Sequence, residues 1–186
     1  MKRAVDIFLA CIAGLIFSLP LMAIVIAVRL TSPGPALYWS ERMGRDLKPF
    51  MMPKFRTMKV STPLEPTENL SNPGQYITPI GGFLRKTSLD ELPQLYSVIV
   101  GNMSLVGPRP VLSSQIDLLK KRENAGVHSL RPGITGWAQI NGRDDIGIDE
   151  KVRLDEEYLL KQGILFDLLI MWKTVFYVLR SRGVWH

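Results

Sequence analysis

An uninterrupted apolar run dominates the N-terminal part of the chain, where no charged side chain occurs from Ile7 to Val28. A straight helix of that length would rise roughly 33 Å at about 1.5 Å per residue, close to the hydrocarbon thickness of a bilayer. A cleaved signal peptide has a shorter apolar region, of about 7–15 residues. The pattern therefore predicts a membrane helix within residues 1–30.

Pro20 interrupts this run. Proline lacks the N–H that would bond the Ile16 carbonyl and its ring crowds that carbonyl, so the helix should kink there. The Ser18 hydroxyl can satisfy backbone groups that the kink frees. Basic residues on both flanks favour the cytoplasmic side: Lys2, Arg3, Arg29, Arg42, Arg45 and Lys48. These residues fit either a re-entrant helix that keeps both ends on one face or a kinked helix that crosses the membrane.

After the apolar run, short aromatic and apolar segments alternate with turn residues. We interpret "ALYWSERM" (36–43) and "KPFMMPKFRTM" (48–58) as the two arms of a β-hairpin that turns near residues 44–46. Pro49 and Pro53 cannot donate ladder hydrogen bonds, which restricts the second arm to a sheet edge.

Helical periodicity returns after residues 61–76, a polar segment with three prolines that is expected to be a surface loop. The periodicity predicts helices at about 89–100, 111–123 and 149–162, the last of them charged and amphipathic. Two compact segments rich in Gly, Pro and Arg, "VGPRP" and "LRPGITGWAQINGR", lie between these helices.

Charged residues also occur in or beside the apolar segments at both ends of the chain. The C-terminal stretch "GILFDLLIMWKTVFYVLRSR" contains Asp167 and Lys173, which argue against a second membrane-spanning helix. It fits either a helix at the membrane interface or a buried core helix. Asp6 lies three residues from Arg3 and four from Lys2, and it is expected to be paired at the lipid headgroup level.

Size and composition limit the class of protein. The chain has 186 residues, which suits one domain, and its net charge of +6 favours anionic partners. Cys11 is the one cysteine, so a disulfide framework and a cysteine-rich metal site are excluded. His128 and His186 are interpreted as ordinary surface residues rather than metal ligands or triad members. No basic groove with interleaved aromatic residues is evident, so we expect no nucleic-acid partner.

Two adjacent carboxylates, Asp90 and Glu91, occur in the stretch "TSLDELPQLY". Ser88 and Glu91 match a capping box, which would give Glu91 a purely structural role and leave Asp90 unassigned. The positive end of the helix dipole favours an ionised carboxylate by roughly 0.3–1 kcal/mol. Asp90 is therefore expected to be a carboxylate at neutral pH, suited to act as a nucleophile or a Mg²⁺ ligand rather than as a general acid.

Several arginines lie beside this stretch and within the two compact segments. Arg85 and Lys86 directly precede it, prolines flank Arg109 in "VGPRP", and Arg131 and Arg143 close the ends of "RPGITGWAQINGR", whose glycines permit close backbone approach. Arginine binds phosphate bidentately, although structural turns with salt-bridged arginines explain each segment equally well. Neither GxxxxGK[ST] nor GxGxxG is present, so the usual nucleotide-binding loops are excluded.

Taken together, "KFRTM", "LRKTSLDELPQLYSVIVGNMSLVGPRP" and "RPGITGWAQINGR", preceded by the broken apolar helix, resemble the bacterial sugar transferases, the small monotopic phosphoglycosyl transferases. The resemblance covers nearly the whole chain. It implies a mixed α/β, mainly helical fold: a single monotopic membrane domain with an N-terminal broken re-entrant helix (residues 1–30, broken at Ser18 and Pro20) and a catalytic domain (residues 31–186) with a small β-hairpin and interfacial amphipathic helices.

The resemblance also implies an activity at the cytoplasmic face of the bacterial inner membrane. A sugar 1-phosphate, expected to be that of an N-acetylated amino sugar, passes from a UDP-sugar to undecaprenyl phosphate with release of UMP. Asp90 would be the nucleophile and a ligand of Mg²⁺, and Glu91 its partner in the dyad. Four arginines would bind the substrates: Arg85, Arg109, Arg131 and Arg143.

Two other functions are open at this stage. A non-enzymatic membrane module would use the basic segments to bind anionic lipid, with the acidic pair only capping a helix. A Mg²⁺-dependent nucleotide-sugar hydrolase would release UMP without a lipid acceptor. The sequence leaves open the sugar, the polyprenol length, the glycan pathway and whether the protein forms a homodimer.

Overall fold

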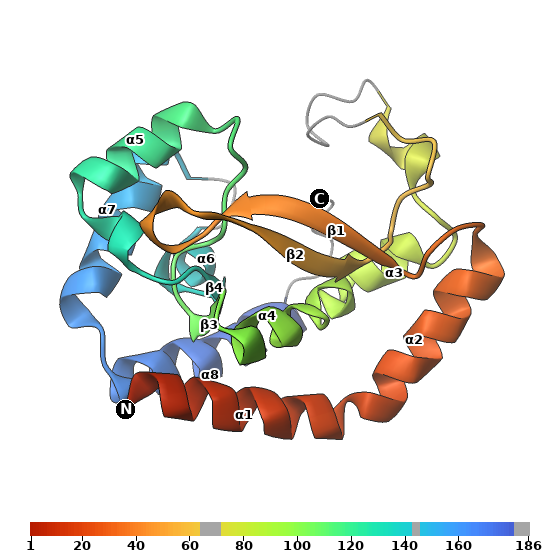
Figure 1. Ribbon diagram of the computed structural model, residues 1–186, viewed down its shortest axis with the longest axis horizontal. Helices are drawn as coiled ribbons and strands as arrows, with labels where there is room; N and C mark the ends of the chain where they lie inside the picture. The colour runs from red at the N-terminus through yellow and green to blue at the C-terminus, as the bar shows by residue number, and fades with distance from the viewer. Residues whose placement is uncertain (64–71, 143–145, 181–186) are drawn as a thin grey trace.

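The structure is a computed structural model that describes residues 1–63, 72–142 and 146–180, with side chains described through residue 176. Helices predominate, and the strands form two small two-stranded sheets. Figure 1 shows the N-terminal helix along one edge of the molecule, a long hairpin across the middle, and the remaining helices packed between and beside them. The predicted mainly helical mixed fold is confirmed.

The N-terminal apolar run forms two helices, α1 (Lys2–Ile16) and α2 (Ser18–Thr31), with an angle of 62° between them. Ser18 Oγ donates to the Leu15 carbonyl at 2.8 Å, and Pro20 lies in the first turn of α2, where a missing N–H costs no helical hydrogen bond. The helix is thus broken at Phe17, directly before Ser18 and three residues before Pro20. No single described helix is long and apolar enough to cross a membrane, whereas the bent pair together has the required length and composition.

The predicted hairpin is confirmed. Strands β1 (Leu37–Met43) and β2 (Pro49–Phe55) pair antiparallel, and the 3-10 turn η1 (Arg45–Leu47) joins them. Met52 packs against α1 and α4 (Gln94–Val100), and Phe55 packs against α2 and α3 (Gly81–Lys86). The hairpin thus links α1 and α2 to α3 and α4, the helices on either side of the acidic pair.

A second, parallel sheet forms from strands that the sequence did not predict, β3 (Ser104–Val106) and β4 (Gly133–Thr135). These strands belong to the two compact segments. A Cβ at Gly107, Gly133 or Gly136 would clash with the backbone of the opposite segment, which confirms the predicted close approach. Four further helices surround this sheet: α5 (Ile116–Asn124), α6 (Trp137–Asn141), α7 (Ile148–Lys161) and α8 (Ile164–Arg180).

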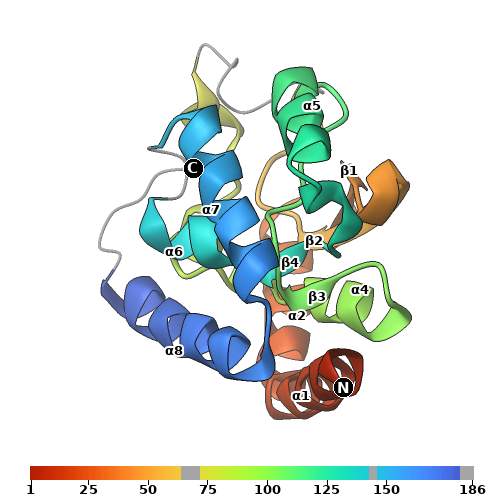
Figure 2. The ribbon, with the colours of Figure 1, turned by 90° about the vertical axis from the view of Figure 1, so that its left-hand side faces the viewer.

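Apolar side chains remain exposed on the outer faces of α1, α2 and α8. Leu15, Leu19, Leu30 and Leu165 are each more than three-quarters exposed. Helix α8 buries Asp167 and Ile170 while Leu168, Leu169, Trp172 and Phe176 are exposed, so it is not a buried core helix. Figure 2 shows α8 beside α1 at the same edge of the molecule. An exposed apolar area this extensive is typical of contact with a membrane or a partner.

Charged side chains join the two ends of the chain on the inner side of α1 and α8. Lys2 Nζ contacts the Asp167 carboxylate and donates to the Val106 carbonyl, and Tyr158 Oη also donates to Asp167, at 2.7 Å. Asp6 is buried and accepts a hydrogen bond from Ser104 Oγ at 2.8 Å. The predicted pairing of Asp6 with Lys2 is confirmed, since Lys2 Nζ lies 3.9 Å from Asp6 Oδ1, and Asp6 additionally binds β3 through Ser104.

Arg56 holds the C-terminal end of α2 against the hairpin. Its guanidinium is almost fully buried and donates to three backbone carbonyls, those of Ser32, Pro33 and Pro35. The C-terminal end of α2 is thereby fixed to Arg56, which directly follows β2 and is two residues from Lys54.

Candidate active site

The acidic pair lies on a three-residue 3-10 turn, η4 (Leu89–Glu91), directly before α4. The capping-box prediction is wrong. Ser88 has φ 56°, a left-handed conformation, and its side chain caps nothing, while the Glu91 N–H donates to the Ser88 carbonyl at 3.2 Å. A left-handed non-glycine residue costs free energy and is often found at functional sites.

Lys54 on β2 binds the Glu91 carboxylate directly. The Lys54 Nζ–Glu91 Oε1 distance is 2.7 Å, and about a fifth of each side chain is exposed. Because Lys54 satisfies Glu91 from a distant part of the chain, the carboxylate has no need of the Ser88 backbone amide. The interaction gives Glu91 a fixed position beside Asp90.

Asp90 itself is buried, with 8% of its surface exposed. Burial, followed by the nearby charge of Glu91, raises the pKa of Asp90 from 3.8 to about 6, although Lys54 and Arg85 act in the opposite direction. The helix dipole, by contrast, favours the ionised form. That effect is small here because a single 3-10 turn, and not a long helix, follows Ser88. At pH 7 and above Asp90 is nevertheless mostly ionised.

Arg85 reaches the acidic pair from α3. Its Nε donates to Thr57 Oγ1 at 3.2 Å and its Nη2 to Met58 Sδ at 3.5 Å. A Cβ on Gly81 would clash with the Thr57 carbonyl, so glycine is required for this close packing of α3. Burial lowers the pKa of Arg85, and the charge of Asp90 partly offsets this effect, which places the two groups near each other.

Arg109 reaches the pair from the segment that follows β3. Its Nη2 lies 3.7 Å from Glu91 Oε1, and 45% of its side chain is exposed. Lys54, Arg85 and Arg109 therefore approach the two carboxylates from three parts of the chain that are distant in sequence.

The other two predicted arginines are placed differently. Arg131 donates to the Gly101 carbonyl at 3.0 Å, at the opposite end of α4 from the acidic pair. Within the part of the chain that the structure describes, no contact joins Arg131 to Asp90 or Glu91. Arg143 lies outside the described residues.

Two site residues were missed by reasoning from the sequence, Lys54 as a partner of Glu91 and Arg42 as a neighbour. The hairpin register pairs Tyr38 with Lys54 and Arg42 with Phe50, and directly paired residues share one face of a sheet. Arg42 and Lys54 therefore project from the same face. Burial and then the charge of Arg109 lower the pKa of Arg42, and Glu91 opposes them. Side chains along "SERM" and "PKF" alternate between the two faces of the hairpin. This shared face could therefore be deduced from the sequence once the pairing register is known.

Four basic side chains thus surround two carboxylates: Arg42, Lys54, Arg85 and Arg109. An excess of positive charge beside a buried, partly protonated carboxyl suits binding of an anion such as a phosphate. No group of three or more His, Cys, Asp or Glu side chains that could hold a metal occurs among the described residues. Mg²⁺ commonly binds one or two carboxylates together with substrate phosphates and waters, so the acidic pair fits it as a site that the substrate completes.

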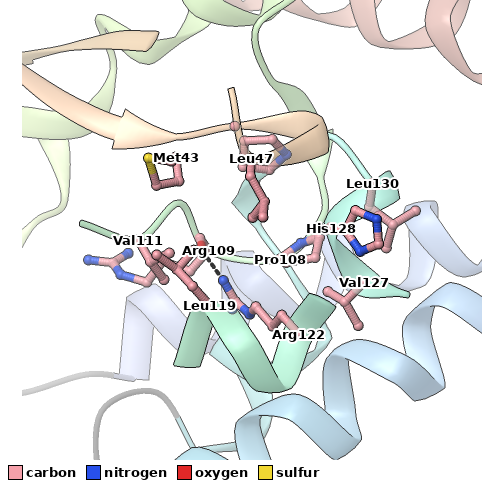
Figure 3. A pocket seen from close by; sticks show the side chains of 12 residues that line it. Met43, Leu47, Pro108, Arg109, Val111, Leu119, Arg122, Val127, His128 and Leu130 are labelled. Atoms are coloured by element: carbon pink, nitrogen blue, oxygen red, sulfur yellow. Dashed lines mark hydrogen bonds between the residues drawn. The ribbon is translucent and has the colours of Figure 1, made fainter. Parts of the chain in front are cut away.

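A small hollow lies behind Arg109, between the hairpin turn and α5 (Figure 3). Met43, Leu47, Val111, Leu119 and Leu130 make its lining largely apolar. His128, expected to be an ordinary surface residue, lines this hollow, and its buried Nδ1 has no hydrogen-bond partner among the described residues.

Comparison with known proteins identifies the family. The family model described as "Bacterial sugar transferase" matches residues 1–181. The chain belongs to the bacterial sugar transferase family. This sugar transferase is 40% identical over 183 residues to the UDP-glucose:undecaprenyl-phosphate glucose-1-phosphate transferase of Escherichia coli (strain K12), covering 95% of this chain and 39% of that protein. It is 39% identical to the uncharacterized sugar transferase EpsL of Bacillus subtilis (strain 168), covering 99% and 90% of the two chains.

A third relative is named for a different sugar, galactose. The sugar transferase is 36% identical to the undecaprenyl-phosphate galactose phosphotransferase of Salmonella typhimurium, covering all of this chain and 42% of that protein. The chain therefore spans less than half of the Escherichia and Salmonella relatives, and most of EpsL. The Escherichia and Salmonella relatives are both named as transferases that act on undecaprenyl phosphate.

Proposed function

We propose that this protein transfers a sugar 1-phosphate from a UDP-sugar to undecaprenyl phosphate through a covalent intermediate on Asp90, releasing UMP. The observation that carries the proposal is the placement of Asp90: a buried carboxylate beside Glu91, approached by Lys54, Arg85 and Arg109. A nucleophile that attacks a diphosphate requires cationic groups of this kind around it.

In the first step, an ionised Asp90 oxygen attacks the β-phosphorus of the UDP-sugar. The bond from that phosphorus to the bridging oxygen breaks, and the bridging oxygen leaves with its electron pair as part of UMP. The sugar phosphate is then esterified to Asp90. Arg85 and Arg109 stabilise the phosphate charge, while Lys54 keeps Glu91 from repelling the incoming anion.

In the second step, a phosphate oxygen of undecaprenyl phosphate attacks the phosphorus of the intermediate. The bond to Asp90 breaks and the carboxylate is restored, giving undecaprenyl diphosphate-linked sugar. Glu91 lies where it can orient the acceptor phosphate and take up its proton if it arrives as the monoanion. Bound at Asp90, Mg²⁺ would neutralise the diphosphate charge.

The two ends of the bent helix pair support a re-entrant topology. At the start of α1, Lys2 binds Asp167 and the Val106 carbonyl, and at the end of α2 Arg56 binds the Ser32 carbonyl. Both ends are therefore attached to the same domain, which a helix crossing the bilayer would not allow. We infer that the bend dips into one leaflet and that α8 lies at the same interface, on the cytoplasmic face. The membrane-bound acceptor and the soluble donor could then both reach Asp90.

The decisive experiment measures UMP from the purified full chain in detergent with Mg²⁺ and a panel of UDP-sugars. The panel contains glucose, galactose and N-acetylated amino sugars, of which we expect an amino sugar to react best. Without acceptor, the correct donor should give a burst of about one UMP per protein, with the sugar phosphate attached to Asp90 by mass spectrometry. Turnover should begin when undecaprenyl phosphate is added and stop when Mg²⁺ is chelated.

Each alternative gives a different result in the same assay. Continuous UMP release without acceptor identifies a nucleotide-sugar hydrolase, and no release with any donor favours a non-enzymatic lipid-binding module. Turnover with acceptor but without any adduct on Asp90 contradicts the covalent route.

The burst should also depend on pH in a defined direction. Because the pKa of Asp90 is about 6, the reactive carboxylate is mostly present above that pH and is lost below it. We expect the burst rate to be nearly constant above pH 7 and to fall about tenfold per pH unit below pH 6. Rapid-quench measurement of UMP between pH 5 and 8 tests this, and a rate still constant at pH 5 would show that Asp90 ionisation does not limit the step.

A further inference from the structure

Arg122, on α5, makes three polar contacts in the wall of the hollow behind Arg109. Its Nε and Nη2 contact Asp155 Oδ2 at 2.9 and 2.6 Å, and its Nη1 donates to the backbone carbonyl of Arg109 at 2.8 Å. Figure 3 shows the last bond as the dashed line between Arg122 and the main chain of Arg109. The guanidinium thus joins α7, which carries Asp155, to the middle of the "VGPRP" segment.

Both members of this ion pair are buried: 9% of the Arg122 side chain and 1% of the Asp155 side chain are exposed. Burying two charges is costly, and an apolar pair of similar volume often gives equal or greater stability. Stability alone therefore does not explain this ion pair. Its arginine also binds the backbone of the segment that carries Arg109, which suggests a role for the pair in that segment.

The backbone on both sides of Arg109 is held by hydrogen bonds. The Val106 carbonyl accepts from Lys2, and the Met43 N–H donates to the Val111 carbonyl at 2.9 Å. The Gly107 N–H donates to the Thr135 carbonyl and the Pro108 carbonyl accepts from the Gly133 N–H, each at 2.9 Å. Between these anchors, the Arg122 bond holds the Arg109 carbonyl. Prolines at 108 and 110 lack N–H groups, so they cannot add backbone donors of their own on either side of Arg109.

We propose that Arg122, supported by Asp155, is a positioning residue that sets the backbone of Arg109 so that the Arg109 guanidinium faces Glu91 and the substrate phosphates. This inference rests on the proposed function, because the role of Arg109 is defined by that reaction. The three contacts of Arg122 described above are with Asp155 and the Arg109 carbonyl, so its effect on the acidic pair passes through Arg109. A displacement of about 1 Å in a substrate-positioning group can lower a rate by about 100-fold.

Arg122→Lys is the informative substitution. A lysine keeps the positive charge beside Asp155, so the buried carboxylate is not left unpaired. Its single ammonium lacks the planar fork of arginine that spans Asp155 and the Arg109 carbonyl together. The control is Leu118→Ala, which removes a buried apolar side chain from the same helix without touching Arg109.

The test is a double-mutant cycle between Arg122→Lys and Arg109→Ala, read as kcat and KM for the UDP-sugar with acceptor present. We expect Arg122→Lys to lower kcat/KM by about 10- to 100-fold in the wild-type background, mostly by raising KM, and by less than about threefold when residue 109 is already Ala. Leu118→Ala should lower the melting temperature, leave KM unchanged, and have the same effect in both backgrounds.

The outcomes separate the two proposals. A wild-type protein that releases no UMP refutes the proposed function. An active wild type in which Arg122→Lys either retains full activity or loses the same factor in both backgrounds refutes the positioning role alone. Thermal unfolding of each variant is measured in parallel, so that a variant that does not fold is recognised. The inference is supported if Arg122→Lys has the melting temperature of the wild type but a raised KM.

Discussion

Asp90→Asn is expected to abolish the UMP burst, lowering its rate by at least about 1,000-fold, because removing a nucleophile eliminates the covalent step. Asparagine has nearly the same shape, so Arg85, Lys54 and Glu91 should stay in place. The measurement is single-turnover UMP release, together with mass spectrometry of the protein after incubation with the donor. Donor binding should persist, since the cationic groups remain.

The same variant should be more stable than the wild type at neutral pH. The folded-state pKa of Asp90 is about 6 and its ordinary value is 3.8, so between these values the folded state binds the proton more tightly than the unfolded chain. Stability contributed by this group is therefore present below about pH 4, falls as pH rises to 6, and stays lost above it. Asparagine avoids the loss, which is on the order of 1–3 kcal/mol.

A pH series of thermal unfolding checks this sign. The melting temperature of Asp90→Asn should exceed that of the wild type at pH 7.5, and the difference should shrink towards pH 4. A variant that is inactive and also less stable at pH 7.5 would indicate that Asn disrupts the fold, and the activity loss would then say nothing about nucleophilic attack.

Lys54→Met should have the second-largest effect, a fall in kcat/KM on the order of 100-fold at pH 7. Methionine keeps the apolar stem but removes the ammonium that contacts Glu91 at 2.7 Å, while the Arg109 contact at 3.7 Å remains. Loss of one partner of a buried charge commonly costs about 2–5 kcal/mol. Lys54 also lowers the pKa of Asp90, so its loss should raise that pKa above 6. The acidic limb of the rate profile should therefore move to higher pH.

Two control variants make the Lys54 result specific. Lys161→Ala removes a largely exposed lysine of α7 that pairs with Glu157, and it should change neither kcat/KM nor the pH profile. Lys54→Arg retains the positive charge, so the pKa that governs the fall of the rate at low pH should stay close to 6. If Lys54→Met reduces the rate without moving the limb, Lys54 contributes through substrate binding and not through the ionisation of Asp90.

Features that depend on neighbouring residues were predictable from the sequence. The break at Phe17, just before Ser18 and Pro20, and the hairpin turn follow from local chemistry, a missing N–H and a cluster of turn residues. Two predicted helices were only partly right for equally physical reasons. The 89–100 segment divides because Pro93 cannot donate to the Leu89 carbonyl, and residues from 111 onward start with a bridge to Met43 instead of a helix.

Features that depend on distant residues were not predictable. The capping box failed because Lys54, 37 positions away, binds Glu91, and the pKa of Asp90 rises because tertiary packing buries it. Strands β3 and β4 are three residues each, too short to show an alternating pattern. Among the predicted arginines, Arg85 and Arg109 approach the acidic pair while Arg131 supports α4, a distinction that only the fold could make.

The contact of Lys2 with Asp167 joins residues 165 positions apart, so its two halves leave the ribosome at very different times. At about 5–20 residues per second, roughly ten to thirty seconds separate them. During that interval the first helix can already pack against Met52 and α4, and Asp6 can already bind Ser104, but Lys2 still lacks its partner Asp167. Synthesis of α8 thus completes an attachment that the earlier parts of the chain have begun.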